Sequence, residues 1–239
     1  MHSGSRKHVL DWIERQRFPQ ELTALLDPSD AVVSPDDRWM PRGNSDDREA
    51  RLERDGQVLL PGAAPWSVLR DWWLVHNGRA NTPNWDLVAS CSFGSRTGLV
   101  LIEAKAHVEE LSNAGKKLKA GVSKRSHENH SRIGSAINEA AGSLSEQFPG
   151  VSISRDSHYQ LSNRVALSWK LATMGVPTVL VYLGFTGDSM HGASIMDDGH
   201  WVTCFKEHTV GVMPTEMLER EIDCGRSSFW ILIRSMPVG

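Results

Sequence analysis

Three ionisable side chains stand at the ends of two apolar runs, in the stretch "WDLVASCSFGSRTGLVLIEAKAH". Glu103 and Lys105 are two residues apart, so on a β-strand they project from the same face. If the two runs pair as a hairpin across "GSRTG", Asp86 lies opposite them. Two carboxylates suit a hard cation such as Mg²⁺ or Mn²⁺, and a neighbouring lysine can orient water or offset phosphate charge. The spacing therefore predicts a metal site suited to phosphodiester chemistry.

The same residues have a structural alternative. Glu103 and Lys105 could form a weak ion pair at an exposed strand end, with Asp86 capping a turn. An acid-x-Lys pattern after an apolar run is short and occurs by chance in many proteins. The elements around the pattern favour the functional interpretation, because a hairpin, helices and a further buried strand follow in order.

The motif "PNWDLVA" followed by "LVLIEAKA" resembles the PD-(D/E)XK nuclease superfamily, which has the restriction-endonuclease-like fold. The resemblance covers about residues 65–185 and implies that Asp86 and Glu103 bind metal, with the backbone carbonyl of Ala104 as a further ligand. It also implies that Lys105 serves the attacking water. One departure from the pattern is that two residues separate Pro83 from Asp86.

A later helix carries a second part of the resemblance, in "YQLSNRVALSWKLA". Some branches of the superfamily place a Gln near a Tyr on such a helix to support the site. By this resemblance Gln160, beside Tyr159, is a candidate catalytic residue. Arg164 follows Gln160 by four residues and shares its helix face, which makes it a candidate contact to nucleic acid. A solvated helix face is the alternative for both.

The elements that must position these residues follow from hydrophobic periodicity and from breakers. We expect one interrupted helix or two short ones over residues 5–26, an exposed connection or lid over 29–55, and a helix over 65–76. Two helices are expected over 106–121 and 131–148, and a clear one over 157–175. Residues 176–185 and 228–236 are typical of buried strands, and a short helix is expected near 215–222.

This order predicts a single α/β fold: a mixed central β-sheet flanked by helices, restriction-endonuclease-like, with an N-terminal helical extension. We expect residues 1–60 to form the extension, an N-terminal helix with a polar connection, and residues 61–239 the nuclease-like domain, within what could be one domain overall. Two loose groupings of metal-ligand residues are attributed to chance, His127 with His130, and Cys204 with His200 and His208.

The composition of the 239-residue chain is that of a globular protein, with 40% hydrophobic and 23% charged residues. Neither a membrane span nor a secretory signal is apparent, which predicts a cytoplasmic protein. Three cysteines without a CxxC pair argue against a disulfide framework.

A local concentration of positive charge follows the hairpin, although the net charge of the chain is −3. Charged runs are usually solvated helix surfaces, but a nuclease needs phosphate contacts near its site. We therefore expect this segment to contact DNA through Lys116, Lys117, Lys119, Lys124, Arg125 and Arg132.

Together these observations predict a Mg²⁺- or Mn²⁺-dependent deoxyribonuclease that hydrolyses phosphodiester bonds with a metal-activated water, more in keeping with an endonuclease than an exonuclease. DNA is the expected partner, and a homodimer is compatible with cutting both strands. Two alternatives stay open at this point. One is a catalytically inactive nucleic-acid-binding module of the same fold, and the other is a protein-interaction subunit.

Overall fold

One mixed β-sheet organises the computed structural model, which describes residues 4–62, 66–76, 78, 80–189 and 193–238. Within these residues the sheet has six strands in the order β1-β2-β3-β4-β6-β5. The central strands β3, β4 and β6 are parallel, and the outer strands pair antiparallel. The predicted α/β class and mixed sheet are confirmed. The strands are Trp39–Met40 (β1), Leu87–Phe93 (β2), Arg96–Lys105 (β3), Thr178–Thr186 (β4), Glu221–Asp223 (β5) and Ser228–Pro237 (β6).

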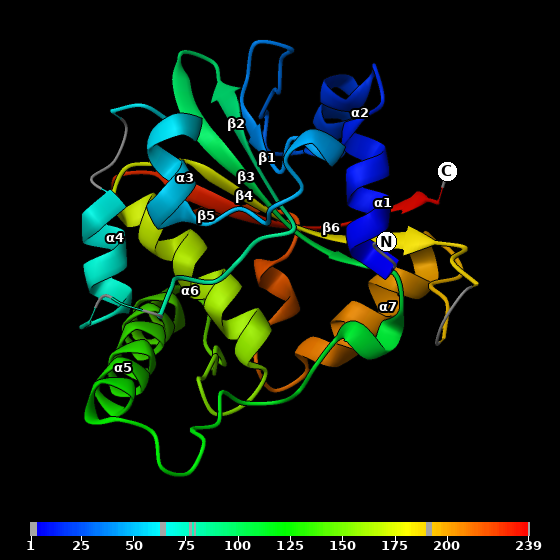
Figure 1. The fold of residues 1–239 in the computed structure, drawn as a ribbon. Helices are drawn as coiled ribbons and strands as arrows, with labels where there is room; N and C mark the ends of the chain where they lie inside the picture. The colour runs from blue at the N-terminus through cyan, green and yellow to red at the C-terminus, as the bar shows by residue number, and fades with distance from the viewer. Residues whose placement is uncertain (1–3, 63–65, 77, 79, 190–192, 239) are drawn as a thin grey trace.

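Helices cover both faces of the sheet (Figure 1). On one face lie α1 (Gly4–Ile13) and α2 (Phe18–Ala24). On the other lie α3 (Leu52–Leu59), α4 (Trp66–Trp73), α5 (Lys124–Gln147), α6 (Tyr159–Thr173) and α7 (Asp198–Thr209). Alternate residues of β3 enter the two cores, since Leu99 and Leu101 pack on the α6 side and Val100 and Ile102 on the α1 side. The later residues of β3 on the Leu101 side therefore project toward α6.

The N-terminal extension is part of this sheet. Its strand β1 pairs with β2, and Val32 and Ala50 form isolated bridges with Ser92 and Trp85. The interrupted helix expected over residues 5–26 forms as α1 and α2, with Pro19 in the first turn of α2. Residues 29–55, expected as an exposed connection or lid, do not form a mobile lid, because these bridges and a 3-10 helix (Gly43–Ser45) fix the segment to the sheet edge, although many of its residues are exposed.

The helix expected over residues 106–121 is also wrong. Only a 3-10 turn forms there (Val108–Glu110), and the chain then runs extended beside residues 155–159. Gly115 explains the difference, because a Cβ atom at this position would lie 2.1 Å from the carbonyl oxygen of Asp156. The backbone N–H of Lys116 donates to the carbonyl of Arg155 at 2.8 Å, so tertiary pairing replaces the helical bonds.

Apart from the short helix expected near 215–222, which is wrong, the other expected elements are confirmed with shifted bounds. The helix over 131–148 begins earlier, at Lys124, where Ser123 caps it. The helices over 65–76 and 157–175 form as α4 and α6; Pro65 lies outside the described residues. In place of a helix at 215–222 there is a 3-10 turn (Thr215–Met217) followed by β5. No helix in the described ranges has the length and apolar character needed to cross a bilayer.

The sequence analysis predicted no helix over the residues of α7. Asp197 caps this helix, since its side chain accepts a hydrogen bond from the N–H of His200. Trp201 and Phe205, four residues apart, form its buried side against the core. The cap and this i, i+4 pair were the available signals.

Candidate functional site

The predicted hairpin aligns the three candidate residues. Leu87 pairs with Ile102, so the continuing register sets Asp86, just before β2, opposite Glu103. Glu103 and Lys105 follow Leu101 on the face of β3 that meets α6. The backbone N–H of Ala104 donates to Asp86 Oδ2 at 2.8 Å and holds that carboxylate at the strand end. The hairpin therefore brings Asp86, Glu103 and Lys105 to one place, as predicted.

Glu103 is the centre of a buried ionic cluster. Its Oε1 pairs with the ammonium of Lys105, and its Oε2 accepts a hydrogen bond from Arg164 Nε at 2.6 Å. The exposed fractions are 2% for Glu103, 4% for Lys105 and 6% for Arg164. The alternative of a weak ion pair at an exposed strand end is therefore wrong, because all three charges lie in the interior.

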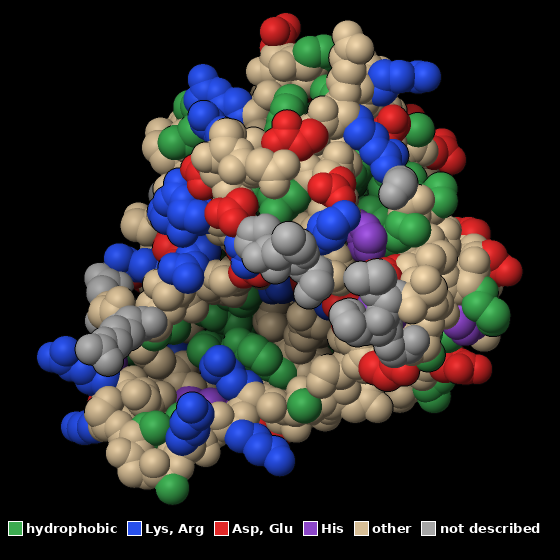
Figure 2. Space-filling model, turned by 45° about the vertical axis from the view of Figure 1, so that its right-hand side comes forward, with side chains coloured by type: hydrophobic (Ala, Val, Ile, Leu, Met, Phe, Trp, Pro, Cys, Tyr) green, Lys and Arg blue, Asp and Glu red, His purple; other side chains and the backbone are tan. Residues whose placement is uncertain are grey.

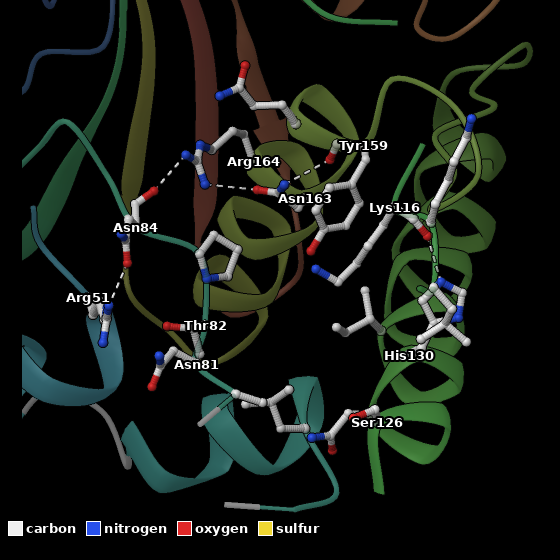
Figure 3. Close-up of a pocket in the computed structure, with 18 of the residues that line it drawn as sticks. Arg51, Asn81, Thr82, Asn84, Lys116, Ser126, His130, Tyr159, Asn163 and Arg164 are labelled. Atoms are coloured by element: carbon white, nitrogen blue, oxygen red, sulfur yellow. Dashed lines mark hydrogen bonds between the residues drawn. The ribbon is translucent and has the colours of Figure 1, made fainter. Parts of the chain in front are cut away.

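Arg164 is fixed on every side of its guanidinium. One Nη atom donates to the backbone carbonyl of Asn84 at 2.6 Å, and the other donates to Asn163 Oδ1 at 2.9 Å (Figure 3). The guanidinium carbon also lies 4.2 Å from the centre of the Trp85 ring. With these partners Arg164 is engaged by the protein itself, and we assign it to holding Glu103 rather than to contacting a phosphate.

The two carboxylates have opposite pKa shifts. Burial raises the pKa of Asp86 to about 7, and the neighbouring Glu103 charge adds to the rise against the opposing effect of Lys105. Burial acts in the same sense on Glu103, but the charges of Arg164 and Lys105 outweigh it and leave its pKa below the ordinary value. Glu103 is therefore ionised near neutral pH, whereas Asp86 gains its negative charge only as the pH passes through about 7.

A cavity of about 800 Å³ opens beside the two carboxylates. Asp86 and Glu103 belong to its lining, together with Gln160, Asn163 and Arg164 from α6. Lys105 does not, because its side chain lies behind Glu103. Glu103 thus separates a lysine in the protein interior from a cavity that a ligand can enter.

Besides Arg164, three of the six basic residues predicted to contact nucleic acid lie at this cavity. Lys116, Lys117 and Lys119 line it from the extended segment that replaces the expected helix. The other three basic residues lie exposed on α5, outside the lining: Lys124, Arg125 and Arg132. Figure 2 shows a hollow on the face it draws, with Lys and Arg side chains along its left and lower rim. The segment thus places positive charge on one wall of the cavity.

The sequence analysis missed two features of the site. It did not predict the pairing of Arg164 with Glu103, although the shared helix face with Gln160 placed Arg164 on the correct side of α6. It also gave no role to Tyr182, which pairs with Glu103 in the β3–β4 register and whose buried hydroxyl has no hydrogen-bond partner among the residues that the structure describes. Burial beside Glu103 raises the pKa of Tyr182 well above its ordinary value, so Tyr182 stays neutral.

The histidine and cysteine groupings attributed to chance do not assemble into a metal site. No group of three or more His, Cys, Asp or Glu side chains in the described ranges is arranged to hold an ion. His130 instead makes a structural bond, from Nε2 to the carbonyl oxygen of Lys116 at 2.6 Å.

Comparison with known proteins does not assign this site. No protein-family model matches the chain, and neither a curated protein nor a solved structure is significantly similar to it. We therefore infer function from the chemistry of the site.

Proposed function

We propose that this protein is a Mg²⁺- or Mn²⁺-dependent nuclease that hydrolyses phosphodiester bonds of DNA, acting as an endonuclease. The observation that carries the proposal is the meeting of Asp86 and Glu103 at one wall of a cavity whose other wall carries lysines. Two adjacent carboxylates supply the oxygen ligands that these cations prefer, and the lysines match the charge of a nucleic-acid backbone.

The donor set fits a hard divalent cation. Asp86 uses one carboxylate oxygen to accept from Ala104, and within the described residues its other oxygen has no partner. The raised pKa of Asp86 reports a carboxyl group short of positive charge, which a cation at this wall would supply. Asp86 and Glu103 would hold the ion, and the carbonyl of Ala104 remains a predicted third ligand. When bound, such an ion activates water and stabilises the charge that develops on phosphate.

The other residues support this pair. Arg164 and Lys105 keep Glu103 ionised and fix its orientation, so a ligand oxygen is available without first losing a proton. The lysines of the cavity wall offset the charge of the approaching phosphate. Gln160 lines the cavity from α6 and would orient water or phosphate there. Lys105 would reach the attacking water only by moving from behind Glu103.

Cleavage of plasmid, linear duplex and single-stranded DNA with Mn²⁺ tests the proposal. We expect cleavage of at least one form, a loss of at least about 100-fold in Asp86→Asn, and no change in the matched variant Asp71→Asn on the outer surface of α4. Thermal unfolding of each variant excludes loss of fold as the cause. Absence of metal-dependent cleavage, or full activity in Asp86→Asn, would refute a nuclease centred on these residues.

A catalytically inactive nucleic-acid-binding module is the second candidate, and one observation favours it. Both oxygens of Glu103 already have cationic partners, Lys105 and Arg164, which can take the place of a metal ion. Titration calorimetry with Mn²⁺ separates the two candidates without any substrate. The nuclease predicts a binding isotherm that Asp86→Asn abolishes, whereas the inactive module predicts salt-dependent DNA binding and no heat from the metal.

A further inference from the structure

The ammonium group of Lys116 lies at the cavity without a negatively charged partner. Its side chain is about half buried, and burial lowers the pKa of its ammonium group. In the described part of the chain no carboxylate or hydrogen-bond acceptor pairs with Nζ, whose one described contact is the face of the Tyr159 ring, 4.8 Å away. A partly desolvated, unpaired charge costs free energy unless a ligand compensates it. Lys116 therefore marks a place for an anionic group.

Tyr159 presents a second unsatisfied group at the same place. Its side chain lines the cavity and its hydroxyl has no hydrogen-bond partner among the described residues. Burial raises its pKa to about 12, so it remains a neutral donor. Figure 3 shows the Lys116 ammonium and the Tyr159 hydroxyl reaching into the cavity together. An ammonium and a phenol hydroxyl are suitable donors to a phosphate oxygen.

The backbone holds Lys116 in position on both sides of its peptide unit. Its N–H donates to Arg155, and its carbonyl oxygen bonds to His130 Nε2 at 2.6 Å. The close approach of Gly115 to Asp156 fixes the segment further. The donor pair is thus part of a built site and not a freely moving surface lysine.

The cavity lining combines polar and apolar side chains. Besides the carboxylates Asp86 and Glu103 it includes apolar residues, among them Leu74, Ala80, Val122 and Ile133. Leu74 and Ile133 are each 4% exposed, so these two side chains belong to the core and present only a small surface to the cavity. An amphiphilic ligand with a phosphate and a flat apolar ring would match both characters.

The walls of the cavity are tied together. Asn129 on α5 accepts hydrogen bonds from the N–H groups of Val75 and His76, each at 2.9 Å, and so links α5 to the end of α4. On the opposite wall, Asn84 is bonded to Arg51 and to Glu49. A volume of about 800 Å³ within such walls is in the range that encloses one small ligand, roughly 300–1,000 Å³.

We propose that this cavity is a subsite for one unpaired nucleotide, whose phosphate binds Lys116 and Tyr159 and whose base enters the part lined by Leu74, Ala80, Val122 and Ile133. The inference rests on the proposed nuclease function and specifies its substrate class as single-stranded DNA. The scissile phosphate would then be the neighbour that faces Asp86 and Glu103.

Fluorescence anisotropy of the full chain in EDTA tests the subsite without any catalysis. We expect a labelled short oligothymidylate to bind at least about 10-fold more tightly than a blunt duplex of equal length. Lys116→Met should weaken the single-strand complex about 10-fold, as expected for one charge-assisted contact. Lys206→Met is the matched control, because Lys206 is exposed on α7 and outside the cavity lining, and its effect should be less than about 2-fold.

A second pair of variants tests the base pocket. Val122→Trp fills the apolar part from a loop and should lower single-strand affinity to that of the duplex. Val68→Trp, on the outer side of α4 with 47% exposure, should leave it unchanged. Equal affinity for both DNA forms, or no effect of Val122→Trp, would overturn the subsite.

The two proposals can fail separately. If Mn²⁺-dependent cleavage occurs equally on fully paired duplex and on single strands, the subsite is refuted and the nuclease stands. If single strands bind as expected but no DNA form is cleaved, the subsite stands and the nuclease is refuted.

Discussion

Two lysines, Lys105 in the protein interior and Lys116 at the cavity, show how the effect of burial on a charge depends on its partners. Lys105 is 4% exposed and its ammonium pairs with Glu103, within a cluster completed by Arg164. Lys116 is half buried in the cavity wall and has the ring of Tyr159 as its neighbour. A paired interior charge maintains structure, whereas an unpaired charge at a cavity indicates a missing ligand. The first region should respond to mutation in stability, and the second in binding.

Arg164→Met gives the largest expected loss of stability. Removing one partner of a buried ion pair costs about 3–5 kcal/mol, and the remaining contact of Glu103 with Lys105 places the expected loss near 3 kcal/mol. Urea unfolding measures it. The matched control is Arg48→Met, which breaks the exposed pair with Asp46 and should leave the free energy of unfolding almost unchanged, because solvent screens that pair. Equal losses in both variants would show that the interior cluster contributes no special stability.

Gly115→Ala tests whether the close packing of the extended segment against Asp156 holds Lys116 in position. The new methyl group would lie 2.1 Å from the carbonyl oxygen of Asp156, so the two segments must separate, at an expected cost of about 1–3 kcal/mol. Single-strand affinity should fall with it, because Lys116 moves. Gly142→Ala is the control, since nothing lies within 4 Å of its added Cβ in the middle of α5. It should stabilise the protein by about 0.5–1 kcal/mol and leave binding unchanged.

The sequence predicted the paired region better than the cavity wall. The hairpin register and strand alternation are local, so Asp86, Glu103 and Lys105 could be brought together from spacing alone. The segment that carries Lys116 has helical composition, and only its contact with a strand-like segment about forty residues later makes it extended. The pairing of Arg164 with Glu103 could not be predicted either, because it joins a residue of α6 to a residue of β3 across the fold. Tertiary contacts decided both cases.

Asp86→Asn should have opposite effects with and without metal. The folded pKa of about 7 lies above the unfolded value of about 3.9, so ionisation of Asp86 disfavours the folded state progressively from about pH 4 to pH 7. Asn does not ionise and can still accept from the N–H of Ala104. The metal-free variant should therefore be more stable than wild type by about 1–2 kcal/mol at pH 8, after allowance for solvent screening, and equal to it below pH 4.

Thermal unfolding across this pH range, with and without Mn²⁺, measures both effects. Wild type should gain stability from Mn²⁺ by mass action, whereas Asp86→Asn should not. A variant that is less stable than wild type at pH 8 without metal would contradict the assigned cause of the pKa shift.

The smallest expected effects distinguish the two tyrosines, whose hydroxyls have no hydrogen-bond partner among the described residues. Tyr182 is fully enclosed, so Tyr182→Phe removes an unsatisfied buried donor and should stabilise the protein by about 1 kcal/mol, with no change in DNA binding. Tyr159 faces the cavity, where its hydroxyl meets solvent or ligand. Tyr159→Phe should change stability by less than about 0.5 kcal/mol and lower single-strand affinity about 3-fold. Urea unfolding and anisotropy on the same two proteins check the pair. If both variants behaved alike in binding, the Tyr159 hydroxyl would have no part in the subsite, and the anion would depend on Lys116 alone.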